Sequence, residues 1–338
     1  MKMVQITREL MPYGSVLLVD DVETNIYVAR GLMSPYGLNI DSASSGFAAI
    51  DKVKNGKVYD IIFMDHMMPV MDGVEATKII RDFGYKHPIV ALTANAVAGQ
   101  ADIFLGNGFD DYISKPIDIR QLNAILNKLI RDKQPPEVIE ALRQQMKPEG
   151  KQPSGGNEYT IIDPFFAEIF VRDAERALAV LEAIYDKNDY SNEEYMRTFI
   201  INVHGMKSAL ANVGKMDLSA VALKLEAAGR EGKIDMILSE TPAFLSSLRA
   251  FVEAITPRKK AGDGEMIVED KQFLFEKLLE IKAACEEFDE NAADEALKDL
   301  RKKVWNQETE DMLVRFSGEI LHCDFDEIIE EINGLTME

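Results

Sequence analysis

One stretch largely decides the fold, and it runs Ile61-Ile62-Phe63-Met64-Asp65-His66-Met67-Met68-Pro69-Val70-Met71-Asp72-Gly73. Its first four residues are uniformly apolar, and two similar runs, Val16–Val19 and Ile89–Leu92, alternate with amphipathic helical stretches. Such runs are typical of parallel strands that are buried on both faces. We therefore expect an α/β domain with a doubly wound, five-stranded parallel sheet, whose weaker last strand is Asp111–Ser114.

Polar residues directly follow the predicted strands: Asp20 and Asp21 the first, Asp65 the third, Thr93 the fourth and Lys115 the last. The carboxyl ends of parallel strands share one edge of the sheet, so these side chains are expected to converge. Three carboxylates at one place repel each other unless a cation sits among them, and an all-oxygen cluster suits Mg²⁺. The pattern indicates phosphoryl transfer to Asp65 as nucleophile, with Lys115 and Thr93 contacting phosphoryl oxygens. A polar residue that simply ends a strand in a loop is common for any one of them, but five together are hard to explain that way.

The region from about Gly14 to Arg131 resembles response-regulator receiver domains. The matching pieces are Val19-Asp20-Asp21, the segment from Met64 to Gly73, Leu92-Thr93-Ala94-Asn95 and Ser114-Lys115-Pro116. The resemblance implies a flavodoxin-like fold, Asp65 as phosphoacceptor, and Lys115 and Thr93 as phosphate contacts. It implies Mg²⁺ held by Asp20, Asp21, Asp65 and the backbone carbonyl of Met67, and a cis peptide before Pro116. Tyr112 matches the family's switch residue, which moves inward as Thr93 engages the phosphoryl group, but it is equally compatible with an ordinary half-buried strand aromatic.

A second phosphate site is indicated far downstream, at His204. Apolar residues recur at helical spacing beside it, at Tyr195, Phe199, Val203, Met206 and Leu210. Lys207, three residues on, shares its side of the helix, where its ammonium could neutralise a phosphoryl group on the imidazole. Gly205 costs helix propensity by roughly 1 kcal/mol relative to alanine, and in return it would let a docking protein approach the ring closely. A lone helical histidine is otherwise usually a surface or boundary residue.

The segment from His204 to Gly214, followed by Leu218 and Leu225–Arg230, resembles the histidine-phosphotransfer (HPt) family. The family carries a lysine three residues after the histidine and a glycine ten residues after it, and both are present here. Ser208 stands where glycine is commonest, and serine is also small. The resemblance implies that His204 is a phosphoacceptor in an all-α four-helix bundle.

Composition is that of a globular protein, with 46% hydrophobic and 28% charged residues among 338. We see no membrane span or signal peptide, and two cysteines offer no disulfide framework, so a cytoplasmic location and no membrane contact are expected. The net charge of −20 includes 22 acidic against 8 basic residues from Glu265 onward. This balance opposes nucleic-acid binding, and no helix-turn-helix region follows the receiver.

We predict five regions: a lead over residues 1–13, a receiver over 14–132, a linker over 133–162, an HPt four-helix bundle over 163–258 and an acidic helical tail over 265–335. Bundle helices are expected at about 163–185, 192–213, 216–230 and 234–255. A separate short helix is expected at 137–145, between the receiver and the bundle. Linker composition is clearest at 147–156. A flexible spacer of some thirty residues spans about 30 Å and gives effective concentrations near millimolar.

The tail contains an approximate repeat, with Cys285 and Phe288 of one copy matching Cys323 and Phe325 of the other. The pattern predicts two helical hairpins, and these four residues are expected to be packing residues without chemistry. Similar helical tails follow HPt modules in some multidomain sensor kinases.

The leading hypothesis is a two-component phosphorelay intermediate, similar to the C-terminal part of hybrid sensor histidine kinases. Asp65 takes a phosphoryl group from the phosphohistidine of a sensor kinase, and His204 exchanges it with Asp65 or with a separate, downstream receiver. The alternative is a phosphorylation-gated interaction module without relay turnover. No glycine-rich ATP-binding loop is visible, so the chain is not expected to be an ATP-using kinase, and whether it counts as an enzyme stays open.

Overall fold

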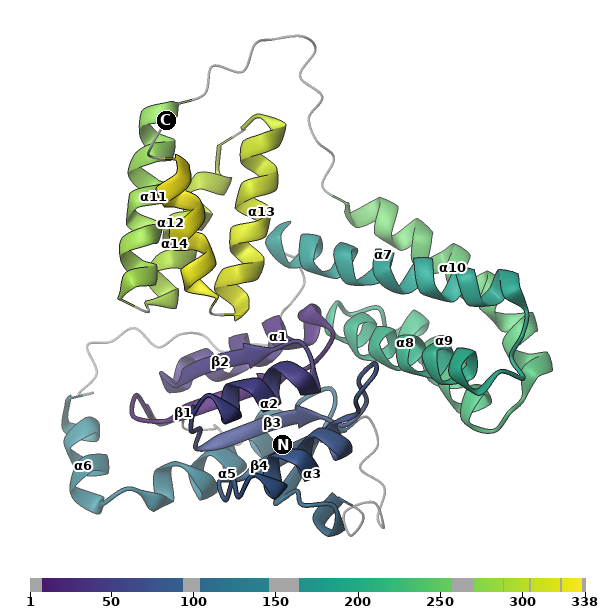
Figure 1. Cartoon of the computed structure of the whole chain (residues 1–338), viewed down its shortest axis with the longest axis horizontal. Helices are drawn as coiled ribbons and strands as arrows, with labels where there is room; N and C mark the ends of the chain where they lie inside the picture. The colour runs from purple at the N-terminus through teal and green to yellow at the C-terminus, as the bar shows by residue number, and fades with distance from the viewer. Residues whose placement is uncertain are drawn as a thin grey trace, which may run out of the picture. The chain divides into compact units, whose positions relative to one another are not determined.

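The computed structural model describes residues 8–93, 104–145, 164–256, 270–287, 289–303, 305–322 and 324–335 (Figure 1). The chain divides into two compact units, Met1–Pro257 and Arg258–Glu338. The piece Ala94-Asn95 of the receiver resemblance, much of the predicted linker, and Phe288 and Cys323 of the repeat lie outside the described residues.

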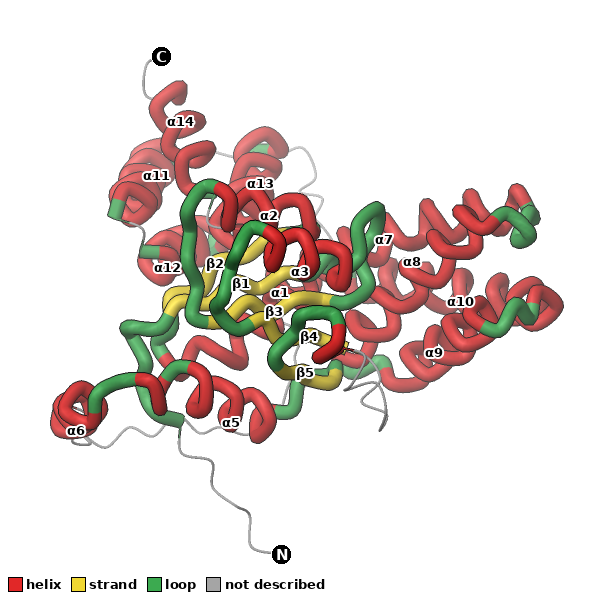
Figure 2. The backbone as a smooth tube through the Cα atoms, turned by 60° about the horizontal axis from the view of Figure 1, so that its bottom comes forward, coloured by secondary structure: helices red, strands yellow, loops and turns green. Residues whose placement is uncertain are grey.

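The first unit is built on a parallel five-stranded sheet, as predicted (Figure 2). Its strands are β1 (Ser15–Val19), β2 (Asn39–Ala43), β3 (Ile61–Asp65), β4 (Ile89–Thr93) and β5 (Asp111–Ser114), in the order β2-β1-β3-β4-β5. Every residue of β3 and β4 is buried, which explains why the first four residues of each strand are apolar. This strand order places a topological switch point between β1 and β3, where doubly wound sheets bind their ligands.

Helices cover both faces of the sheet: α1 (Glu23–Met33), α2 (Gly46–Lys54), α3 (Gly73–Asp82) and α5 (Ile119–Leu129). Alternate residues of each strand enter two different cores. Leu17 and Ile62 pack with α2 and α3 on one face, whereas Leu18 and Phe63 pack with α1 and α5 on the other. Met11, in the predicted lead, is fully buried in the second core, and its N–H bonds to the carbonyl of Tyr36 at 2.6 Å.

Shorter elements complete this part of the chain. The 3₁₀ turns η1 (Ser34–Tyr36) and η2 (Arg131–Lys133) follow α1 and α5, and α6 spans Pro136–Gln145. Side chains cap the amino ends of three helices around the sheet: Ser45 for α2, Asp72 for α3 and Asp118 for α5. These caps satisfy N–H groups that have no partner within the helix.

Four long helices form the rest of the first unit: α7 (Pro164–Lys187), α8 (Glu193–Asn212), α9 (Met216–Arg230) and α10 (Ile234–Ile255). Their bounds lie within two residues of those expected from the sequence. Each helix packs on two others of the set, and all four share one core that includes Phe170, Phe199, Leu225 and Phe244. Val22, from the start of α1, also belongs to this core, so the sheet domain and the four helices are in direct contact.

The second unit is also helical, with α11 (Lys271–Glu286), α12 (Glu290–Arg301), α13 (Gln307–His322) and α14 (Phe325–Leu335) around a core of its own. Trp305 and Phe316 are buried there. Cys285 and Phe325, two residues of the repeat, are also buried packing residues. Among the described residues, no helix is both long and apolar enough to span a membrane.

Candidate functional site

The predicted residues at the strand ends converge on Lys115, which follows β5. Its ammonium lies 2.6 Å from Asp20 Oδ2 and 2.8 Å from Asp65 Oδ2, and its backbone N–H donates to the carbonyl of Thr93 at 2.6 Å. The peptide bond between Lys115 and Pro116 is cis, as predicted. Three strands thus bring two carboxylates and one ammonium together at the edge of the sheet.

Carboxylate oxygens of Asp20, Asp21 and Asp65 all lie within 4.8 Å of one another. Burial raises the pKa of Asp20, and it raises the pKa of Asp21 still further, with the neighbouring Asp20 and Asp65 carboxylates adding to the effect. Three acids and one lysine leave this cluster two negative charges in excess when all are ionised. Oxygen donors with that charge fit a hard divalent cation such as Mg²⁺.

Asp65 itself remains ionised in this environment. Burial alone would raise its pKa, but the Lys115 ammonium and the neighbouring imidazoles hold the pKa of Asp65 well below its usual value. The opposite charges of Asp20 and Asp65 raise the pKa of Lys115 in spite of its burial. The Asp65 carboxylate is therefore available as a nucleophile, held in place by a permanent ammonium.

Gly73 supports Asp65 from behind. A Cβ at this position would lie 1.9 Å from the backbone oxygen of Asp65, and the Gly73 N–H donates to the carbonyl of His66 at 3.2 Å. Only a residue without a side chain allows this approach. The glycine that closes the 61–73 stretch thus fixes the turn after β3.

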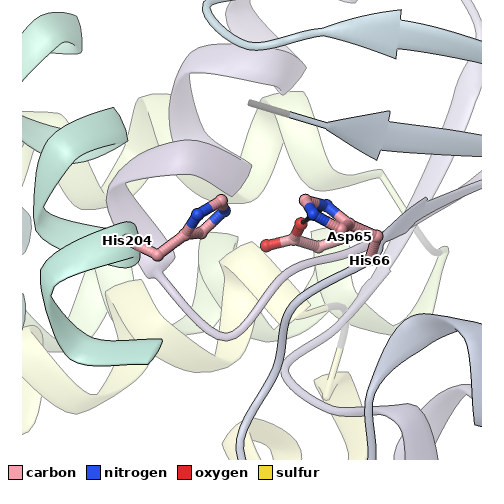
Figure 3. A group of neighbouring side chains, drawn as sticks. All are labelled: Asp65, His66 and His204. Atoms are coloured by element: carbon pink, nitrogen blue, oxygen red, sulfur yellow. Dashed lines mark ion pairs between the residues drawn. The ribbon is translucent and has the colours of Figure 1, made fainter. Parts of the chain in front are cut away.

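His204 lies on α8 and points toward Asp65, as Figure 3 shows. One ring nitrogen of His204, one of His66 and a carboxylate oxygen of Asp65 all lie within 4.8 Å of one another. The rings of His66 and His204 meet edge to face, with centroids 5.3 Å apart. The two phosphoacceptors predicted from distant parts of the sequence are therefore neighbours.

Glu226 on α9 orients the His204 ring. Its Oε1 lies 2.9 Å from His204 Nδ1, and burial lowers the pKa of His204 in spite of that carboxylate. The ring is accordingly neutral at pH 7, and a carboxylate partner places its proton on Nδ1. His204 Nε2 is buried without a hydrogen-bond partner among the described residues, so its lone pair is free.

Lys207 lies on the Nδ1 side of the ring. Its ammonium is 2.5 Å from Glu226 Oε2 and 3.4 Å from His204 Nδ1, and Arg230 also contacts the same carboxylate, at 2.9 Å. Burial lowers the pKa of Lys207, whereas the neighbouring imidazole and ammonium outweigh burial and lower the pKa of Glu226. The Glu226 carboxylate is thus ionised and contacts both cations and the imidazole.

Helix α1 contacts α7 and α8 beside the site. Glu23 pairs with Arg172 and, at 2.9 Å, with Arg176. Asp173 Oδ2 accepts from both the N–H and the hydroxyl of Thr24 at 2.7 Å, and burial raises the pKa of Asp173 to about 6. These contacts hold the four helices against the edge of the sheet where Asp65 lies.

Val22 packs directly against Gly205 across this interface. A Cβ built on Gly205 would lie 2.9 Å from Val22 Cγ2. The glycine was expected to permit close docking at His204, and in the structure the docked surface is the chain's own α1.

Two further predicted residues lie near the site. The N–H of Met67 is 3.4 Å from Asp65 Oδ1, which places this residue in the loop directly beyond the carboxylate. Tyr112 is half-buried on β5 and stacks on Phe104, with centroids 6.5 Å apart. Glu226 and His66 were not among the site residues predicted from the sequence.

Known proteins resemble this chain chiefly over the sheet domain. Residues 16–127 match the response regulator receiver domain model. The two-component response regulator ORR41 of rice (Oryza sativa subsp. japonica) is 41% identical over 116 residues, which are 33% of this chain and 91% of that protein. The sensor protein GacS of Pseudomonas syringae pv. syringae is 30% identical over 227 residues, which are 62% of this chain. That match extends beyond residues 16–127, but it spans only 24% of GacS.

Among solved structures, the chain is similar to the receiver domain of a sensor histidine kinase from Pseudomonas aeruginosa PAO1. That structure holds a magnesium ion in its active site cleft. The two are 35% identical, with a TM-score of 0.32, over 35% of this chain and 98% of that one.

Proposed function

This chain belongs to the response regulator receiver domain family, and from that premise we propose that it is a two-component phosphorelay intermediate in which Asp65 and His204 exchange a phosphoryl group. The observation that carries the proposal is the approach of His204 to the Asp65 carboxylate within one compact unit. We further propose that α7 to α10 form an HPt module. The GacS match supports this reading because it continues beyond the receiver.

In the first step, an Asp65 oxygen attacks the phosphorus of a donor phosphohistidine. An O–P bond forms, the donor's N–P bond breaks, and the donor imidazole keeps the released electron pair. Lys115, 2.8 Å from the other Asp65 oxygen, is placed to balance the charge of the acyl phosphate, and Thr93 supplies a hydroxyl at the same edge. Mg²⁺ bound by Asp20, Asp21, Asp65 and the Met67 carbonyl would neutralise further negative charge on the transferring group.

In the second step, the lone pair of His204 Nε2 attacks the phosphorus. An N–P bond forms, the bond between phosphorus and the Asp65 oxygen breaks, and Asp65 returns to a carboxylate. The proton on Nδ1 stays in place, so the ring gains positive charge, and the Glu226 carboxylate 2.9 Å away stabilises that charge. The reverse step follows the same path.

A sensor histidine kinase is the proposed donor and a separate receiver domain the proposed acceptor downstream. Only 2% of Asp65 and 1% of His204 are exposed, so the docked arrangement shields both phosphoacceptors from outside proteins. Exchange with either partner then requires the HPt module to move away from the receiver. The same burial favours the second candidate function, in which phosphorylation gates the exposure of these surfaces to a binding partner without relay turnover.

The test uses a phosphorylated donor with Mg²⁺ and the full chain. Phosphoaspartate is lost in base and phosphohistidine in acid, so the two labels can be separated. Asp65→Asn is expected to abolish all labelling, and His204→Gln to keep the base-labile label but lose the base-stable one. Base-stable label that persists in His204→Gln would assign the relay site to another residue, and label confined to Asp65 in the wild type would favour the gated module.

A further inference from the structure

His66 is an imidazole that the proposed relay does not use, although it lies next to both phosphoacceptors (Figure 3). Its Nδ1 is 3.0 Å from the carbonyl of Leu92 and 3.5 Å from Asp65 Oδ1. Because a carbonyl only accepts, Nδ1 carries the proton that this bond needs, and the other ring nitrogen keeps a lone pair. His66 is thus fixed in place with one nitrogen able to bind a ligand.

The other two members of this group also have free electron pairs. His204 Nε2 is buried and has no hydrogen-bond partner in the part of the chain that the structure describes. The Lys115 ammonium pairs with Asp65 Oδ2 at 2.8 Å, and the other carboxylate oxygen of Asp65, Oδ1, lies on the side of His66. Two imidazoles and one carboxylate therefore present donor atoms to the same small volume.

That donor set differs in chemistry from the neighbouring Asp20–Asp21–Asp65 cluster. Oxygen-only ligands suit Mg²⁺, whereas imidazole nitrogens favour zinc and the other late first-row ions. Ligand atoms around a tetrahedral zinc, bonded at about 2.0–2.2 Å, lie about 3.3 Å apart. One nitrogen of each imidazole and one Asp65 oxygen already lie within 4.8 Å of one another, so side-chain shifts of about 1.5 Å, together with a turn of the His66 ring that brings its unprotonated nitrogen forward, would complete a three-ligand site.

We propose that Asp65, His66 and His204 form a site for a borderline transition-metal dication, with Zn²⁺ as the representative ion. Two ligands come from the receiver and one from α8, so the ion ties the two modules together. It also occupies the lone pair of His204 and an oxygen of Asp65, the two atoms that the proposed relay needs. Zn²⁺ is therefore expected to hold the docked state and to stop transfer, but metal binding itself does not depend on the relay proposal.

The experiment titrates Zn²⁺ alone into the full chain, without a phosphoryl donor, in competition with a chromophoric chelator. Co²⁺ serves as a second probe, because its absorption reports nitrogen and oxygen coordination. The variants His66→Gln and His204→Gln each remove one ligand, and His87→Gln removes an exposed histidine of the receiver as the matched control. Gly205→Ala leaves all three ligands in place but obstructs their approach at Val22.

One Zn²⁺ per chain is expected, bound at least about tenfold more weakly by both ligand variants and by Gly205→Ala, and unchanged in His87→Gln. The Gly205→Ala result does not depend on removing a ligand, so it stands even where a histidine variant folds poorly. Wild-type affinity in either ligand variant, an equal loss in His87→Gln, or no Zn²⁺ binding by the wild type would each overturn the proposal. A relay that fails while Zn²⁺ binds as expected would refute the proposed function alone.

Discussion

Replacing Gly205 by alanine should undock helices α7 to α10 from the receiver without destabilising α8. Alanine favours a helix over glycine by about 1 kcal/mol, so the helix itself gains. Its Cβ, however, would lie 2.9 Å from Val22 Cγ2, whereas carbon atoms pack at about 3.5–4.0 Å. Overpacking of this kind costs about 1–3 kcal/mol, which lowers the docking equilibrium by roughly 5- to 150-fold.

The assay is single-turnover transfer of label from Asp65 to His204 in the full chain. We expect Gly205→Ala to slow that transfer by a comparable factor while labelling of Asp65 by a small phosphodonor is unchanged. Val22→Ala removes both γ carbons and loses about 1.6 kcal/mol of apolar burial, but it makes room for the new methyl. The double variant should therefore transfer faster than Gly205→Ala alone. Wild-type transfer in Gly205→Ala, or strictly additive losses in the double variant, would refute the docking argument.

Three further changes probe the site and its interface. Glu226→Gln keeps a hydrogen-bond acceptor for His204 but removes the negative charge that stabilises the phosphorylated ring. A hydrogen bond to a charged group contributes about 1.5–3 kcal/mol, so single-turnover transfer should slow by roughly 10- to 150-fold. An unchanged rate would show that Glu226 plays no part in the transfer. Because burial raises the pKa of Asp173 to about 6, its contribution to stability is complete below its ordinary pKa near 4 and is lost as the pH rises through about 6. Between pH 4 and 7.5, the free energy of unfolding measured in urea should fall by roughly 1–3 kcal/mol more in the wild type than in Asp173→Asn. A difference between the two proteins that does not change with pH would contradict the raised pKa of Asp173. Gly73→Ala places a Cβ 1.9 Å from the backbone oxygen of Asp65. The yield of acyl phosphate from a small phosphodonor should therefore fall at least about tenfold, and the free energy of unfolding should fall by about 1–3 kcal/mol. Normal labelling would show that the turn can relax around the new side chain.

The sheet was largely predictable because buried parallel strands are apolar along their whole length. β1, β3 and β4 each contain four consecutive apolar residues, and the polar residue at or directly after the last position of each strand marked where that strand ends. β2 carried no such signal. It lies at the edge of the sheet, pairs only with β1, and its sequence from Asn39 to Ala43 mixes exposed and buried residues. An edge strand with one neighbour has no reason to be uniformly apolar.

The convergence of Asp20, Asp65 and Lys115 followed from strand order, but the surroundings of His204 did not. Glu226 looks like one more charged residue on a helix next to Arg230, and only packing shows it buried beneath the imidazole. A small residue at 205 suggested close docking, although nothing in the sequence told which surface would dock there. Gly205 and Val22 are nearly two hundred positions apart, and no local pattern records their contact.

The most direct test of exchange between Asp65 and His204 is the fate of a phosphoryl group placed on Asp65. The wild-type chain is loaded through a phosphorylated donor, freed of the donor, and quenched at intervals at two protein concentrations with Mg²⁺ present. We expect base-stable label that replaces the acyl phosphate at a rate independent of protein concentration and that is absent from His204→Gln. Acyl phosphate that decays only by hydrolysis, or a transfer rate proportional to protein concentration, would contradict the exchange between Asp65 and His204 within one chain.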